Sequence, residues 1–201
     1  MSHNQALEKI LFLDIEEQEK REREENLNFI ATKTYVIVDA SKIEKLTNEL
    51  SALTTLSYAN LFTQEDFETL EEVAPYLIEL KKEDDFTTWV YENVYGELGS
   101  LFIHSTATIE ELSEHFREYI TTTMEVAHPK NKDEMMLTKA YVRLYDPRVF
   151  PDFLQSLEDS SSFFYNIQEL YVEDKHRATI LKSFSSQGEK KIDLEELLCS
   201  M

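Results

Sequence analysis

The spacing of apolar residues changes along the chain and separates a charged N-terminal part from the rest. Leu7, Ile10 and Leu11 recur at the three-to-four spacing of one helix face, whereas residues 16–25 contain no apolar side chain. Acid-to-base pairs four residues apart, such as Glu19 and Arg23, favour a helix there. We therefore expect residues 1–30 to form a charged helix or arm that is solvated rather than dedicated to a partner.

From residue 34 onward, short β-branched runs alternate with helical patterns. Strands are predicted at 34–39, 54–59, 77–80, 100–104 and 167–172. Helices are predicted between them, at 41–53, from 63, from 86 and at 109–120. Ser41 with Glu44 and Thr108 with Glu111 have the spacing of capping boxes, and Thr63 and Asp84 are further helix-start residues. This alternation indicates an α/β fold with mainly parallel strand pairing over 34–120.

Two long alternating segments, 121–128 and 137–145, flank a polar stretch and predict an antiparallel hairpin. Asp146 and Pro147 follow, and their types suit the N-cap and first position of a helix. The expected fold class is therefore α/β: a mixed sheet flanked by helices, with an antiparallel hairpin in the C-terminal half and a charged N-terminal helix. We expect one α/β domain over 31–174. A tail over 175–201 is expected to be loose at 183–191 and to end in a short helix or docking peptide.

Charge is strongly negative and unevenly placed. The 201 residues include 40 acidic and 20 basic ones, a net charge of −20. Residues 31–128 hold 19 acidic and 6 basic residues, so the middle of the chain carries most of the excess. This balance argues against binding to nucleic-acid backbones, which requires clustered Lys and Arg. Either the charge only solvates the protein or it meets a basic partner.

Several classes of site are excluded by composition. Cys199 is the single cysteine, so neither an internal disulfide nor a cysteine-based zinc site can form. Three scattered glycines cannot build a phosphate-binding loop, and no two histidines stand three or four residues apart. We expect no cofactor, no metal site, no membrane span and no secretory signal, and a cytoplasmic location.

Two groups of residues could carry chemistry or binding. His104 and Ser105 end a predicted strand and, with Asp146, could form a small hydrolase site, although such residues occur by chance in most chains. Arg143 and Tyr145 share one face of a predicted strand, and Arg143 and Arg148 flank Asp146. This run forms either a structural corner or an exposed binding patch. Strand placement predicts that Arg143→Ala destabilises the fold more than Arg148→Ala.

An ordered set of short motifs resembles the type VI secretion effector adaptor (effector chaperone) family of Gram-negative bacteria. The motifs span about residues 34–172: Val38-Asp39-Ala40, Leu61-Phe62, Ala74-Pro75-Tyr76-Leu77, Leu101-Phe102-Ile103-His104-Ser105, His115-Phe116-Arg117 and Arg143-Leu144-Tyr145-Asp146-Pro147-Arg148-Val149. The charged helix and the tail lie outside the match.

The resemblance implies a cytoplasmic protein without enzymatic activity. It would bind one cognate toxic effector and promote loading of that effector onto the secretion spike protein. The resemblance also implies a set of signature positions, which either contact the effector or hold the fold. They are His115, Arg143, Tyr145, Asp146, Pro147 and Arg148. An immunity-type protein that neutralises a toxin is the main alternative, and the hydrolase is a further one.

Overall fold

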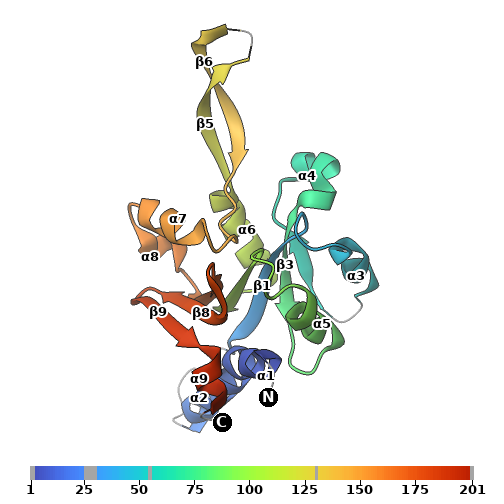
Figure 1. Cartoon of the computed structure of the whole chain (residues 1–201), viewed down its shortest axis with the longest axis vertical. Coiled ribbons are helices and arrows are strands. Elements are labelled where there is room, and N and C mark those ends of the chain that lie inside the picture. Colours follow the sequence, from blue (N-terminus) through green and yellow to red (C-terminus); the bar gives the residue numbers. More distant parts are fainter. Residues whose placement is uncertain (1–2, 25–30, 54–55, 130, 200–201) are drawn as a thin grey trace.

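The computed structural model describes residues 3–24, 31–53, 56–129 and 131–199. Its centre is a seven-stranded sheet in the order β2-β3-β1-β4-β7-β8-β9 (Figure 1). The strands are β1 (Lys33–Asp39), β2 (Tyr58–Asn60), β3 (Pro75–Leu80), β4 (Ser100–Ser105), β7 (Ile167–Asp174), β8 (Arg177–Ser185) and β9 (Gly188–Asp193). The α/β class with helices flanking the sheet is confirmed.

The expected parallel pairing over 34–120 is wrong, because each neighbouring pair of described strands is antiparallel. The reason lies in the position of β1. Both β3 and β4 pair antiparallel with β1, one on each side, so they run parallel to each other without touching. In this sheet, strands that are joined through helices are therefore not hydrogen-bonded to each other as parallel pairs.

Helices cover both faces of the sheet. They are α1 (His3–Glu8), a π-helical turn (Lys9–Leu13), α2 (Asp14–Glu24), α3 (Leu46–Ala52), α4 (Gln64–Leu70), a 3-10 turn (Glu71–Val73), α5 (Asp85–Asn93), α6 (Ile109–Ile120), α7 (Phe150–Ser156), α8 (Ser160–Phe163) and α9 (Leu194–Cys199). The Thr34 hydroxyl donates to the Leu11 carbonyl, whereas the Tyr35 hydroxyl donates to the Ala107 carbonyl just before α6. Because successive strand residues point to opposite faces, the N-terminal helix and α6 lie on opposite sides of β1.

The helix starts follow the expected chemistry at three of four sites. Thr108 forms the complete capping box with Glu111, and Thr63 and Asp84 each accept a backbone N–H at their helix starts. The box expected at Ser41 does not form. Its N–H and hydroxyl both donate to Asp39, and the helix begins later, at Leu46.

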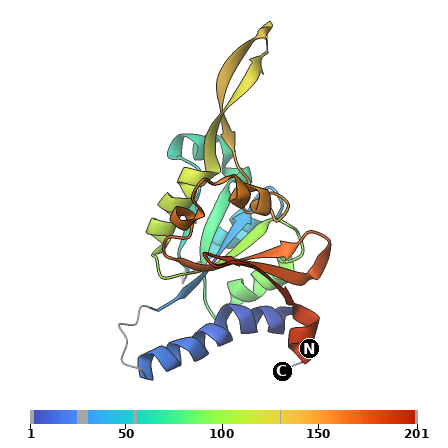
Figure 2. The same cartoon turned by 90° about the vertical axis from the view of Figure 1, so that its left-hand side faces the viewer.

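The N-terminal helix is only partly solvated. Ala6, Leu7, Ile10 and Leu11 are buried in the core, and the helix lies beside α9 along one side of the molecule (Figure 2). Within the π-helical turn, the Leu11 carbonyl accepts the Thr34 hydroxyl at 2.8 Å. Only α2, which carries the charged run, fits the expectation of a solvated helix.

The segment expected to be loose, 183–191, belongs to the sheet instead. β8 pairs with β7 and β9 pairs with β8, through a turn in which Gly188 has a φ of 120°. Phe184 is buried and packs its ring 5.1 Å from that of Phe150 in α7. Burying such side chains stabilises the fold by about 2 kcal/mol each, which offsets the polarity of the turn.

The expected hairpin is present and stands away from the body (Figures 1 and 2). It consists of β5 (Thr121–His128) and β6 (Asn131–Tyr141), which pair only with each other among the described strands. We call residues 121–141 the arm. The second strand ends at Tyr141, four residues before the predicted end, because its partner residue Thr121 is where β5 begins after α6.

Candidate functional site

The signature residues 143–148, here called the signature corner, form a compact turn between the arm and α7. The Val142 N–H donates to the Ile120 carbonyl at 2.7 Å, which joins the foot of the arm to the end of α6. The Asp146 N–H then donates to the Arg143 carbonyl, and the Asp146 carbonyl accepts from the N–H groups of Val149 and Phe150. Arg143 and Tyr145 are therefore not on a strand, and the expected shared strand face is wrong.

The helix predicted at Asp146 and Pro147 begins later. α7 starts at Phe150, and Pro151, rather than Pro147, occupies its first turn. Asp146 does not cap α7. Its side chain instead accepts the N–H of Arg148, within the turn before the helix, at 2.9 Å. Pro147 is buried in this turn.

Asp146 and Arg148 form a bidentate ion pair. Arg148 Nε lies 2.8 Å from Asp146 Oδ1, and Arg148 Nη2 contacts Oδ2. Burial opposes ionisation of Asp146, but the hydrogen bonds from Arg148 outweigh it, so the pKa of Asp146 is lowered. Asp146 as a residue is 4 % exposed, and the Arg148 side chain is half-exposed. This pair holds the turn and leaves one edge of the guanidinium toward solvent.

Arg143 pairs with a different carboxylate. Its Nη1 lies 3.9 Å from Oδ2 of the buried Asp39, and its side chain is 52 % exposed. Asp39 already accepts the N–H and hydroxyl of Ser41. Burial, and then the charge of Asp39, raises the pKa of Tyr145, which is itself buried. Arg143 thus pairs with Asp39 and Arg148 with Asp146, instead of both pairing with Asp146.

His115 lies apart from the corner. Its Nε2 is 2.9 Å from the Phe163 carbonyl, and its ring packs against Tyr119 and Phe163. Burial lowers the pKa of His115, which favours the neutral ring. His115 therefore connects α6 to α8, within a group of phenylalanine and tyrosine rings.

The three residues considered for hydrolysis do not assemble into a triad. The Ser105 hydroxyl donates to the Asn166 carbonyl at 2.6 Å and accepts from the Ala107 N–H. Asp146 is paired with Arg148, and His104 Nδ1 lies 3.3 Å from the Tyr171 hydroxyl. Each side chain is thus bonded to a different part of the fold.

A polar cavity of about 240 Å³ beneath the N-terminal helix was not foreseen from the sequence. The Tyr171 hydroxyl donates to Glu169 at 2.6 Å, and Glu169 also accepts from the Ser183 hydroxyl. Burial lowers the pKa of His104, which lines this cavity, to about 4. The alternation of Glu169 and Tyr171 was visible in the sequence, but the helix that covers them could not be placed.

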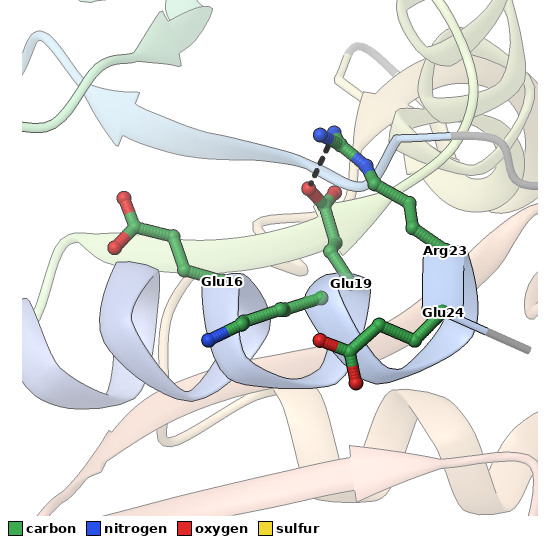
Figure 3. Close-up of a pocket in the computed structure, with 5 residues that line it drawn as sticks. Glu16, Glu19, Arg23 and Glu24 are labelled. Carbon is green, nitrogen blue, oxygen red and sulfur yellow. Dashed lines mark hydrogen bonds and ion pairs between the residues drawn. The ribbon is translucent and has the colours of Figure 1, made fainter.

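Charged side chains line a surface pocket along α2 (Figure 3). Glu19 accepts from Arg23 at 3.4 Å, as its spacing predicts, and also from the Thr32 N–H. Glu17 pairs with Arg21 at 3.7 Å, whereas Glu16 contacts Lys82 on the body of the protein. Glu19 thus connects α2 to the residue before β1, and Glu16 connects it to the residues after β3.

The arm carries a group of exposed apolar side chains. Met124, Met135, Met136 and Leu137 are 48, 59, 37 and 68 % exposed, and they are four of the eight large apolar residues that stand exposed in the described part of the chain. Met124 and Met136 lie on one face of the hairpin, and Met135 and Leu137 on the other. Exposed, adaptable methionines are typical of protein-binding surfaces.

Two kinds of site are absent from the described residues. No three His, Cys, Asp or Glu side chains there lie together as metal ligands would. No helix in those ranges has both the length and the apolarity to cross a membrane.

Comparison with known proteins gives one match. A family model described as "Domain of unknown function (DUF4123)" matches residues 34–162. No curated protein and no solved structure matches the chain. The matched segment begins in β1, includes the arm and the signature corner, and ends in α8. The chain therefore belongs to the DUF4123 family, which is associated with type VI secretion effector adaptors.

Proposed function

We propose that this protein is a cytoplasmic adaptor that binds a cognate toxic effector and promotes its loading onto the type VI secretion spike protein. The observation that carries the proposal is the family match over residues 34–162, about two thirds of the chain. The ordered motifs of the same region point to the same family role.

Features of the molecule support a binding role over a catalytic one. Ser105, His104 and Asp146 use their polar atoms in separate contacts within the fold. The arm instead exposes apolar side chains, and no other described strand pairs with it. A protein that holds a partner needs such a surface, whereas a hydrolase needs a nucleophile with a base beside it.

The proposal is tested by co-expressing the protein with the products of the open reading frames that flank its gene. We expect a toxin-domain protein to co-purify in a fixed stoichiometry, and deletion of the adaptor to abolish secretion of that toxin alone. Absence of any complex with a neighbouring toxin or spike protein would refute the proposal. Protection of recipient cells, with secretion unchanged on deletion, would show an immunity protein instead.

A further inference from the structure

The arm differs in charge from the rest of the molecule. Residues 121–141 contain three acidic and three basic residues and are therefore neutral, in a chain of net charge −20. At its foot Lys139 of the arm pairs with Asp66 in α4, and the Tyr141 ring lies 4.5 Å from that of Phe62, just before α4. Beyond that foot, the hairpin extends from the body in both views (Figures 1 and 2).

Both faces of the arm carry uncovered apolar side chains. A hairpin that is covered on one face alternates apolar and polar residues, but Met135, Met136 and Leu137 are consecutive and each is exposed. A two-stranded hairpin is at best marginally stable by itself in water. Continuous apolar character on both faces is typical of strands that are enclosed from both sides.

The acidic residues beside the foot of the arm indicate the charge that a partner bound to the arm should carry. Residues 64–73, which comprise α4 and the 3-10 turn, contain five acidic residues and no basic one: Glu65, Asp66, Glu68, Glu71 and Glu72. Of these, Asp66 has its charge matched by the arm, through Lys139. A second copy would bring another acidic body to the same place, whereas a basic rim would be attracted.

We propose that the arm is the effector-docking element, inserted into an apolar cleft of the effector whose rim is basic and faces α4. This inference rests on the proposed adaptor function. The two methionine-bearing faces would contact opposite walls of the cleft, and the acidic helix would steer the approach. Methionine side chains can adjust to the shape of such walls.

The test compares variants of the full-length protein for binding to the purified neighbouring toxin. One variant replaces all four side chains, with Met124→Thr, Met135→Thr, Met136→Thr and Leu137→Thr, because threonine keeps strand propensity while removing apolar contact. The matched control is Tyr165→Thr, since Tyr165 is 71 % exposed but lies between α8 and β7. We expect affinity to fall at least about tenfold in the arm variant and to stay within about twofold in the control.

Two double variants test the claim that both faces are enclosed. Met124→Thr with Met136→Thr alters one face, and Met135→Thr with Leu137→Thr alters the other. We expect each pair to weaken binding, and raising the salt concentration from 50 to 500 mM to slow association with the unaltered protein at least about threefold. Weaker binding from only one of the two double variants would overturn the two-sided cleft. An association rate that does not change with salt would overturn its basic rim.

The remaining outcomes separate the two proposals. If the unaltered protein binds no neighbouring toxin, the adaptor function fails. If it binds and the four-residue variant binds equally well, the adaptor function stands and the arm is not its docking element. If light scattering shows a dimer of this chain that the arm variant dissolves, the arm docks a second copy, which overturns the proposed occupant.

Discussion

The signature corner and the arm are neighbours in sequence, yet they use opposite chemistry. The corner buries the Asp146 carboxylate, which accepts from the N–H and guanidinium of Arg148. The arm exposes apolar groups and carries no net charge. The difference teaches that Asp146, within the most recognisable motif of the chain, is bonded inside the fold, whereas the less distinctive hairpin beside it exposes apolar surface.

The largest effect on stability is expected from removing the corner carboxylate. Asp146→Ala leaves the Arg148 N–H and guanidinium without their acceptor in a buried turn, so we expect the free energy of unfolding to fall by about 2–3 kcal/mol. Urea denaturation measures this change. Asp152→Ala is the control, because Asp152 is exposed in the first turn of α7 and should cost about 0.5 kcal/mol. Equal losses would show that Asp146 is not held as a buried ion pair.

Glu173 shows what a buried carboxylate does without such an arginine. It is 1 % exposed, and its Oε1 accepts from the Ser100 hydroxyl at 3.4 Å. Burial raises the pKa of Glu173 to about 7, against the lowering effect of the Gly96 and Leu98 N–H groups. The folded state therefore holds a proton that the unfolded chain releases near pH 4.5, so this group's stability contribution is full below pH 4.5 and is lost as pH rises toward 7.

Glu173→Gln should remove the fall in unfolding free energy that Glu173 causes between pH 4.5 and 7. We expect the difference in unfolding free energy between variant and unaltered protein to grow in favour of the variant from pH 4.5 to 7, on the order of 2–3 kcal/mol. Thermal or urea unfolding at several pH values measures it. A difference that does not change with pH would mean that the two states bind protons equally at this position.

The two arginines of the corner should contribute unequally. Arg148→Ala should cost more stability than Arg143→Ala, because it removes a bidentate partner from a buried carboxylate. Arg143→Ala should cost less than about 0.5 kcal/mol, because its ion pair is exposed and 3.9 Å long. This order reverses the one predicted from strand placement. A larger loss from Arg143 in urea denaturation would contradict the geometry of the corner.

The smallest effect on stability is expected at the arm. The four threonine substitutions at Met124, Met135, Met136 and Leu137 remove exposed side chains, so the free energy of unfolding of the body should change by less than about 0.5 kcal/mol. The measurement is the urea midpoint, followed by tryptophan fluorescence of Trp89 in α5. A loss of several kcal/mol would show that the arm supports the body instead of projecting from it.

Local signals predicted much of the fold. The strand around Val36, the capping box at Thr108 and the arm hairpin all follow from short-range patterns. The order of the strands does not follow from such patterns, because β1 lies between β3 and β4, which both come later in the chain. The tail was misjudged because the polar residues of β9 lie on an exposed edge, where alternation is weak.

The site was harder to predict for a physical reason. Sequence spacing suggested that Arg143 and Tyr145 share a strand face, but the length of β5 determines where β6 ends. The predicted second strand begins at residue 137, so Met135 and Met136 fall outside it, whereas β6 begins at Asn131. Sequence also does not show whether a hairpin is covered. Burial is a property of the whole chain, so the exposure of the arm required the three-dimensional arrangement.

Hydrogen–deuterium exchange of the protein alone and with the purified toxin tests the central claim most directly, since it reports on the arm and the corner together. Amides on the outer edges of β5 and β6 have no partner among the other described strands, so we predict that exchange along the arm slows on binding. Exchange around Asp146 should stay unchanged, because its turn is already hydrogen-bonded. Protection at the corner with none at the arm would contradict the account.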